Sequence, residues 1–187
     1  MSPSLESQLN ESIEVQSSLS NLLPVIQKAS ETVLSCLLGG GKILSCGNGG
    51  SAADAQHLTE EFIGRYRSNR IPLPAVALTA DTQAITCIAN DFGWEEIFSR
   101  QVRGLGRKGD ILVAFSTSGN SENVIRALNA AKELGVITIN LSGKNGGKSK
   151  GLADIEIIIP SQNTARIQEA HTFILHCILE HVESHYA

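Results

Sequence analysis

The sequence predicts a doubly wound α/β fold, in which helices cover both faces of a five-stranded parallel sheet. Short β-type apolar runs alternate with longer segments whose apolar residues recur at helical spacing. Three of the short runs are almost continuously apolar, as strands buried on both faces require. The chain has 187 residues, 42% hydrophobic and 18% charged, which is enough apolar material for one core. We therefore expect a single domain over residues 1–187, with a helical arm at 1–40 and an α/β core at 41–187.

The arm is expected to form two helices. Apolar residues recur at helical spacing from Ser4 to Leu38, and the run ends at three glycines that signal a helix stop. We place the break between the helices at residues 21–24. The first helix is polar over most of its surface, so we expect it to lie against a neighbouring subunit or on the outside of the core helices. A solvated helical arm is an equally open alternative.

The core is expected to contain five strands joined by crossover helices. The strands are predicted in the runs KILSCG, PAVALTA, DILVAFST, VITINLSG and DIEIIIP. The segments 52–66, 82–90 with 95–105, and 121–134 have helical patterns and are long enough to connect parallel strands. A closing amphipathic helix is predicted from about residue 164 to 185, and residues 143–150 resemble a loop.

Charge and cysteine usage exclude several classes of protein. Fifteen Lys and Arg against nineteen Asp and Glu give a net charge of −4, which argues against a generic basic protein that binds nucleic acid. The first thirty residues lack a basic start followed by an apolar stretch, and no apolar run reaches the roughly 18 residues of a membrane span. We expect neither secretion nor membrane insertion. The four cysteines have no CxxC spacing and are expected to be reduced, mostly buried thiols of a cytoplasmic protein: Cys36, Cys46, Cys87 and Cys177.

Two turns after predicted strands have unusual composition, and ligands of parallel α/β sheets bind at the carboxyl ends of the strands. Residues 47–51 are rich in glycine, and residues 116–121 carry four hydroxyls in six positions. Each turn leads into a helix, whose amides and dipole attract a phosphate. Simple helix capping needs only one hydroxyl, so the second turn predicts a cradle for a phosphate or polyol.

The glycine turn also fits the loose dinucleotide pattern G-x-G-x-x-A. That pattern requires an acidic residue about 20 positions further on, at the end of the second strand. The nearest candidate, Asp81, lies some 30 positions after the last glycine, which disfavours a nicotinamide cofactor.

Two helical segments carry groups that could transfer protons or bind a metal. His57 and Glu61 lie four residues apart on one helix face, followed one turn later by Arg65. On spacing alone, such a pair more often forms a salt-bridged surface. The closing helix adds five polar candidates: Gln168, Glu169, His171, His176 and His181. Three histidines in one helix are too many for a core, so we expect most of them to face solvent.

Taken together, these motifs resemble the phosphoheptose isomerases of the sugar isomerase (SIS) domain family. The resemblance covers nearly the whole chain and rests on four segments: CGNGGSAADAQHLTEEFIGRY, IANDFGWEEIFSRQ, STSGNSENVIRA and ARIQEAHTFILH. It implies a flavodoxin-like three-layer domain and an aldose-ketose isomerase acting through an enediol on sedoheptulose 7-phosphate. The implied product is D-glycero-D-manno-heptose 7-phosphate, at the first step toward nucleotide-activated heptose and lipopolysaccharide. It further implies a cytoplasmic homotetramer with active sites at subunit interfaces and one zinc ion per subunit.

Carried over position by position, the resemblance implies a role for each matched residue. Glu61 and His176 would be catalytic, and the zinc ligands would be His57, Glu61, Gln168 and His176. The implied substrate contacts are Asn48, Gly49, Gly50, Ser51, Glu61, Arg65, Asn90, Asp91, Ser116, Thr117, Ser118, Ser121 and Gln168. Gln168 and His176 are eight residues apart, about 12 Å along a helix and about 80° around it. A single metal would need both side chains to reach toward each other, or a group from a neighbouring subunit.

Two alternatives remain within the same fold. One is a non-catalytic SIS tetramer that binds the replication initiator or senses a sugar phosphate, and such a protein needs no proton-transfer pair. Its replication-associated members lack a histidine at the position of His176 and depart from the STSGNS loop, whereas this chain has both. The other is an isomerase of a different sugar phosphate, such as a hexulose or arabinose phosphate, which would share the cradle without the paired groups on the two helices.

Overall fold

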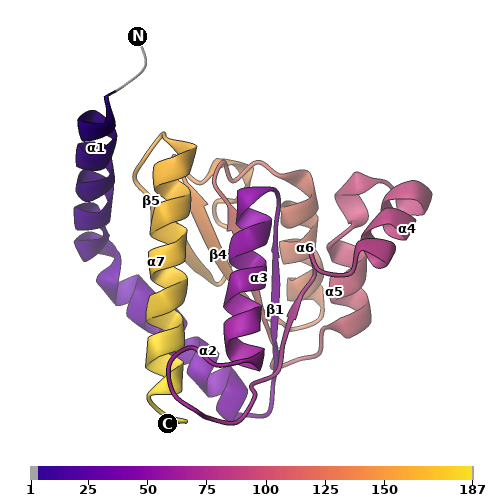
Figure 1. Cartoon of the computed structure of the whole chain (residues 1–187). Helices are drawn as coiled ribbons and strands as arrows, with labels where there is room; N and C mark the ends of the chain where they lie inside the picture. The colour runs from indigo at the N-terminus through magenta and orange to yellow at the C-terminus, as the bar shows by residue number, and fades with distance from the viewer. Residues whose placement is uncertain (1–3, 187) are drawn as a thin grey trace.

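The five-stranded parallel sheet is confirmed. The fold was obtained as a computed structural model, which describes residues 4–186. The strands are β1 (Ile43–Gly47), β2 (Ala75–Ala77), β3 (Ile111–Ser116), β4 (Ile137–Gly143) and β5 (Ile155–Ile159), in the spatial order β2-β1-β3-β4-β5 (Figure 1). Every pairing is parallel. Because the chain turns to opposite sides of β1 to form β2 and β3, a topological switch point lies between β1 and β3.

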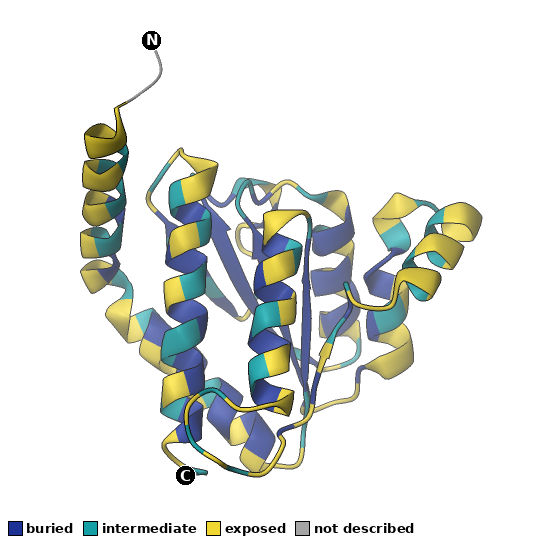
Figure 2. Ribbon diagram, in the orientation of Figure 1, coloured by how far each residue is buried: buried dark blue, intermediate teal, exposed yellow. Residues whose placement is uncertain are grey.

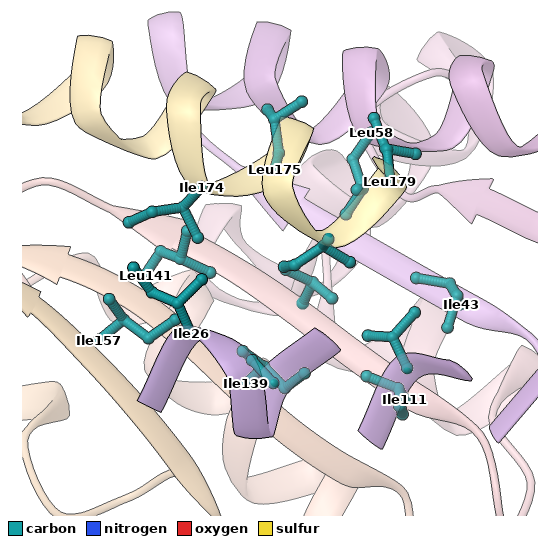
Figure 3. Close-up of a cluster of buried hydrophobic side chains, with 14 of the residues drawn as sticks. Ile26, Ile43, Leu58, Ile111, Ile139, Leu141, Ile157, Ile174, Leu175 and Leu179 are labelled. Atoms are coloured by element: carbon teal, nitrogen blue, oxygen red, sulfur yellow. The ribbon is translucent and has the colours of Figure 1, made fainter. Parts of the chain in front are cut away.

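Helices cover both faces of the sheet and give three layers. On one face lie α2 (Leu23–Leu38), α3 (Gly50–Ile63) and α7 (Thr164–Glu183), and on the other lie α5 (Ser99–Leu105) and α6 (Glu122–Glu133) (Figure 1). Successive residues of a strand point to opposite faces. Ile43 and Ile111 therefore join the core that α2, α3 and α7 cover, part of which Figure 3 shows, whereas Leu44 and Leu112 join the core under α6. Figure 2 shows the sheet as the most deeply buried layer.

The arm breaks two residues earlier than the sequence predicts. Helix α1 (Leu5–Ser18) ends in a 3₁₀ turn, η1 (Leu19–Leu22), before α2 begins. Within α1 only Val15 is buried, and the helix lies beside α7 (Figure 1). The contact is polar: Ser12 Oγ donates to Glu169 Oε2 at 2.8 Å, and Asn163 Nδ2 donates to Glu11 Oε2 at 2.8 Å. Within this chain, α1 thus lies on the outside of a core helix.

The segment between β2 and β3 contains an exposed helix, α4 (Thr82–Phe92), followed by α5, which packs against the sheet. Helix α4 buries none of its residues, and it is followed by a 3₁₀ turn, η2 (Trp94–Glu96). Asp81 caps α4, since its Oδ1 accepts the Ala84 N–H at 2.9 Å. Asp81, the acidic residue considered above for a nicotinamide cofactor, therefore serves as a helix cap. Between β4 and β5 the chain forms a loop with one 3₁₀ turn, η3 (Gly147–Ser149), where the sequence indicates a loop.

The expectation that most histidines of the last helix face solvent is wrong. His171 is fully buried against Phe115, and its Nε2 lies 3.2 Å from the Ser142 carbonyl oxygen. Burial lowers the pKa of His171 to about 4, so the ring is neutral. His176 and His181 are half-buried.

All four cysteines are free thiols. Cys36 and Cys46 are buried and Cys177 is half-buried, as expected, but Cys87 is exposed because it lies on α4. No helix within residues 4–186 is long and apolar enough to cross a membrane.

Candidate active site

The two unusual turns meet at the switch point of the sheet. The glycine turn follows β1 and the hydroxyl turn follows β3, which is the neighbouring strand. A pair of amide side chains joins them: Asn48 Nδ2 donates to Asn123 Oδ1 at 2.8 Å, and Asn123 Nδ2 donates to Asn48 Oδ1 at 3.0 Å. Asn123 is buried in the first turn of α6. Asn123 lies only two residues beyond the hydroxyl turn, but it is not among the residues that the sequence motifs indicate.

The glycine turn brings backbone amides close to this edge of the sheet. Gly49 is the N-cap of α3 and has φ +58°, a conformation that glycine adopts without steric cost. A cavity of about 160 Å³ opens beside the turn and is lined by Asn48, Gly49 and Trp94, among others. The first-turn amides of α3 are the groups that this geometry offers to an anion.

The hydroxyl turn is more than a helix cap. Ser121 is the N-cap of α6, but its hydroxyl makes no capping hydrogen bond and instead accepts from Ser116 Oγ at 3.3 Å. Ser118 Oγ accepts the Asn120 N–H at 3.1 Å. Thr117, Ser118 and Ser121 are half-buried, so their hydroxyls are within reach of a ligand. The turn therefore provides hydroxyls and helix amides at one place.

A second cluster forms where α3 and α7 lie side by side (Figure 1). Near the start of both helices, the Gln168 amide occupies the space above Gly50, where an added Cβ would lie 2.4 Å from Nε2. One turn further on, Thr172 Oγ1 donates to Asp54 Oδ1 at 3.0 Å. After another turn, His176 Nε2 lies 3.4 Å from His57 Nε2. These three contacts thus follow one another along two parallel helices, α3 and α7.

At the third contact, His57 lies at a spacing typical of zinc ligands from both His176 and Glu61. The Nε2 atom of His57 lies 3.4 Å from His176 Nε2 and 3.5 Å from Glu61 Oε1. Ligand atoms about 2.0–2.1 Å from a tetrahedral zinc ion are roughly 3.4 Å apart. Two imidazoles and a carboxylate are also typical zinc ligands. His176 and Glu61 therefore each lie at a suitable spacing from His57 Nε2, whereas the three described residues whose ligand atoms all lie within 4.8 Å of one another are His57, Glu60 and Glu61.

The remaining predicted ligand, Gln168, lies elsewhere. Its amide lies beside Gly50, two helical turns before His176, and the Asp54–Thr172 hydrogen bond lies between the two levels. Glu60, which is not among the predicted ligands, has a carboxylate oxygen within 4.8 Å of ligand atoms of His57 and Glu61. The only signal for it in the sequence is its position next to Glu61.

The environment shifts the pKa values of the two candidate proton-transfer groups in opposite directions, raising that of Glu61 and lowering that of His176. Burial raises the pKa of Glu61, and the neighbouring Glu60 charge adds to that rise. The Glu61 side chain remains 18% exposed, so a ligand can reach it. Burial, and then the charges of His57 and Arg67, lower the pKa of His176. A raised pKa makes the Glu61 carboxylate a stronger base, and a lowered pKa favours the neutral His176 imidazole, in which one ring nitrogen can donate a proton while the other accepts one.

Three predicted contact residues lie outside both clusters in this chain. Arg65 is exposed in the segment that follows α3. Asn90 and Asp91 are exposed on α4, where Asn90 Nδ2 donates to Asp91 Oδ1 at 2.7 Å. Among the residues that the structure describes, no hydrogen bond or ion pair connects them to His57, Glu61 or His176.

A larger cavity lies at the opposite edge of the sheet. It has a volume of about 740 Å³ and opens at the amino ends of the strands, between residues that include Lys28, Lys42, Arg107 and Asp110. It contains none of the predicted site residues. Cavity size alone would therefore direct attention away from the hydroxyl turn and the histidine pair.

Comparisons with known proteins identify the family of the chain and agree with its overall fold. The family model of the SIS domain matches residues 9–143. The phosphoheptose isomerase of Shewanella pealeana is 50% identical over 183 residues, which cover 96% of this chain and 93% of that relative. Among solved structures, the phosphoheptose isomerase of Neisseria gonorrhoeae is 45% identical with a TM-score of 0.90, covering 96% of this chain and 97% of that one. That of Francisella tularensis is 40% identical with a TM-score of 0.93, covering 96% of both chains.

Proposed function

The chain belongs to the SIS-domain family, among its phosphoheptose isomerases, and we propose that it converts sedoheptulose 7-phosphate to D-glycero-D-manno-heptose 7-phosphate. The observation that carries this proposal is the convergence of Glu61 and His176 on His57 Nε2. A non-catalytic SIS protein would not need such a pair. The reaction is an aldose-ketose isomerisation, in which one proton moves from C1 to C2 and another moves from O1 to O2.

The two proton transfers are assigned to different side chains. Glu61 removes the proton from C1 of the ketose and returns it to C2 of the enediol, a role that its raised pKa favours. His176 moves the proton between O1 and O2 as a neutral imidazole, the form that its lowered pKa favours, with one ring nitrogen donating and the other accepting. Glu61 and His176 lie beside His57 before any substrate binds. Little reorganisation of these side chains is therefore required in the transition state.

The phosphate of the substrate is assigned to the hydroxyl turn. Ser116, Thr117, Ser118 and Ser121 would hold it together with the first amides of α6. The glycine turn at 48–51 would contact the sugar hydroxyls through its backbone and through Asn48. Binding the remote phosphate in this way fixes C1 and C2 relative to the catalytic pair.

His57, Glu61 and His176 would hold one zinc ion per subunit. When bound, the ion polarises substrate oxygens and stabilises negative charge on the enediolate. The distance of Gln168 from this group supports a site completed at a subunit interface, with Gln168 reaching the metal of a neighbouring copy. Arg65, Asn90 and Asp91 are assigned to the same interface, because in this chain they are exposed. We infer a homotetramer on the same grounds.

The compartment of the enzyme and the use of its product are inferred from its family. We infer that the enzyme acts in the cytoplasm as one domain spanning residues 1–187, and that its product leads to nucleotide-activated heptose for lipopolysaccharide. Four free cysteines support a reducing compartment.

The test is a pair of matched carboxylate variants of the zinc-loaded protein. Glu61→Gln keeps the shape of the side chain but removes its basicity, so turnover of sedoheptulose 7-phosphate should fall by roughly 10²–10⁴-fold. Glu60→Gln is the control, since it removes the neighbouring charge and should change turnover far less. Zinc content and sugar-phosphate affinity are measured in both proteins. A Glu61→Gln variant with parental turnover would overturn the assignment of the carbon base.

A further inference from the structure

The ring of His176 is in contact with aromatic rings on two sides. The Tyr66 ring stacks against it with centroids 5.5 Å apart and planes inclined by 29°. The His57 ring meets it nearly perpendicularly, at 5.0 Å and 81°. Aromatic rings favour both arrangements at these distances. The terminal torsion of a histidine side chain is otherwise broad, so a ring stacked on its face restricts the plane in which Nε2 points toward His57.

Tyr66 itself lies outside any helix or strand, in the segment between α3 and β2. The Glu183 carboxylate holds that segment by its backbone. It accepts the N–H groups of Tyr66 at 3.2 Å, Arg67 at 2.9 Å and Ser68 at 3.0 Å. Glu183 is only 5% exposed, so these charge-assisted hydrogen bonds are made away from bulk water. The last residue of α7 thus fixes the backbone that carries the tyrosine.

Arg70 connects the same carboxylate to the end of α3. Its side chain is 1% exposed, and its Nε lies 3.5 Å from Glu183 Oε1. The guanidinium also donates to the carbonyl oxygens of Glu61 at 2.6 Å and Phe62 at 2.8 Å. A buried carboxylate requires such a partner. Glu183 is seven residues, almost two full turns, after His176 and therefore lies on the same face of α7.

From these contacts we propose that Tyr66 is a positioning residue for His176, and that Glu183 sets Tyr66 in place. The inference rests on the proposed function, because it concerns the histidine assigned to the oxygen-bound proton. The aromatic ring makes the contact, so phenylalanine should replace tyrosine at this position. Loss of the ring should leave His176 free to rotate. The hydroxyl turn, which lies after β3, should bind phosphate as before.

The first experiment compares Tyr66→Leu with Tyr66→Phe. We expect the kcat of Tyr66→Leu to fall about 10–100-fold, the usual effect of removing a group that orients a ligand or catalytic side chain. KM should change little, and Tyr66→Phe should restore kcat. Tyr186→Leu makes the same substitution at the other tyrosine of the chain, which packs against the core, and controls for a general loss of stability.

The second experiment needs no turnover. In the metal-free protein, the ring-proton resonances of His176 are assigned by comparison with His176→Asn and then followed in each variant. Stacking on Tyr66 should shift them upfield. Tyr66→Leu should remove that shift, Tyr66→Phe should retain it, and Tyr186→Leu should leave it unchanged. Unchanged resonances and an unchanged kcat in Tyr66→Leu would overturn the positioning role.

The role of Glu183 is tested in the parent protein and in one variant. The backbone amides of Tyr66, Arg67 and Ser68 should exchange slowly with solvent deuterium, and fast exchange would overturn the role assigned to the carboxylate. Glu183→Gln, if folded, should shift the His176 resonances in the same direction as Tyr66→Leu. A parent enzyme that turns over no sugar phosphate would refute the proposed function, whereas the resonance shifts would still decide whether Tyr66 positions His176.

Discussion

Replacing Gly119 by alanine tests whether the loop after β4 shapes the phosphate cradle. Gly119 has φ +64°, and a Cβ at this position would lie 1.9 Å from the Gly146 carbonyl oxygen. Ordinary contact begins at 3.4 Å, so that oxygen would have to move by about 1.5 Å. Such a shift threatens the hydrogen bond from the Ser149 N–H to the Gly119 carbonyl oxygen, at 2.8 Å, and the bond from the Lys148 N–H to Asn120 Oδ1, at 3.0 Å.

The expected cost combines two effects. A left-handed alanine costs about 1–2 kcal/mol, and each weakened hydrogen bond costs about 0.5–1.5 kcal/mol, so the free energy of unfolding should fall by about 3 kcal/mol. Gly40→Ala is the matched control. It has φ +79° but no atom within 4 Å of the added Cβ, so it should cost only the conformational part.

The assay is urea unfolding of both variants, followed by calorimetric titration with a sugar phosphate. Gly119→Ala should be the less stable variant and should lose affinity at least tenfold, because the cradle is displaced. Gly40→Ala should bind like the parent. Equal stability and equal affinity in the two variants would refute the claim that the packing of these two loops shapes the cradle.

Three further outcomes are expected. The pKa of His171 is about 6.5 in the unfolded chain and about 4 in the folded protein, so between these values the unfolded chain binds more protons. The free energy of unfolding should therefore be unaffected by His171 above pH 6.5 and should fall by about 3 kcal/mol as the pH is lowered from 6.5 to 4. Denaturant unfolding against pH checks this, and His171→Met should remove that part of the slope. Replacing Ser118 and Ser121 together by alanine should weaken sugar-phosphate binding at least tenfold, since two charge-assisted hydrogen bonds of about 1.5–3 kcal/mol each are lost; unchanged calorimetric affinity would contradict the cradle. Deleting residues 1–20 should lower the oligomeric state or the activity, because α1 exposes Leu5, Leu9 and Ile13; a fully active tetramer in sedimentation would show the arm to be dispensable.

The pattern of apolar residues was sufficient to predict the sheet. Runs such as DILVAFST are short, apolar and flanked by turn residues, and local sequence therefore defines them as buried strands. The break in the arm was placed too late. Leu19 and Leu22 continue the helical spacing, and a 3₁₀ turn preserves that pattern while changing the hydrogen bonds.

His171 shows where a signal was present but overlooked. It lies in a stripe with Ile167, Ile174 and Ile178, whose spacing of four, three and four residues marks the buried face of α7. The spacing alone would have placed this histidine in the core. The number of histidines in the helix does not show which face of the helix each of them occupies.

Other parts of the site depend on contacts that no local pattern specifies. Tyr66 and Glu183 are 117 residues apart, and their contact exists because the segment after α3 passes the end of α7. The position of Gln168 beside Gly50 likewise follows from the register of two helices. The spacing of Gln168 and His176 nevertheless indicated correctly that the two side chains occupy different levels of one helix.

The central claim is that this chain moves a carbon-bound proton between C1 and C2 of a ketose phosphate. The most direct measurement is incubation of the zinc-loaded protein with sedoheptulose 7-phosphate in deuterated water, with NMR detection of the product. Proton exchange at the base during transfer predicts deuterium at C2 of an aldose phosphate. No turnover and no label at C2, from a folded protein that binds zinc, would contradict the isomerase.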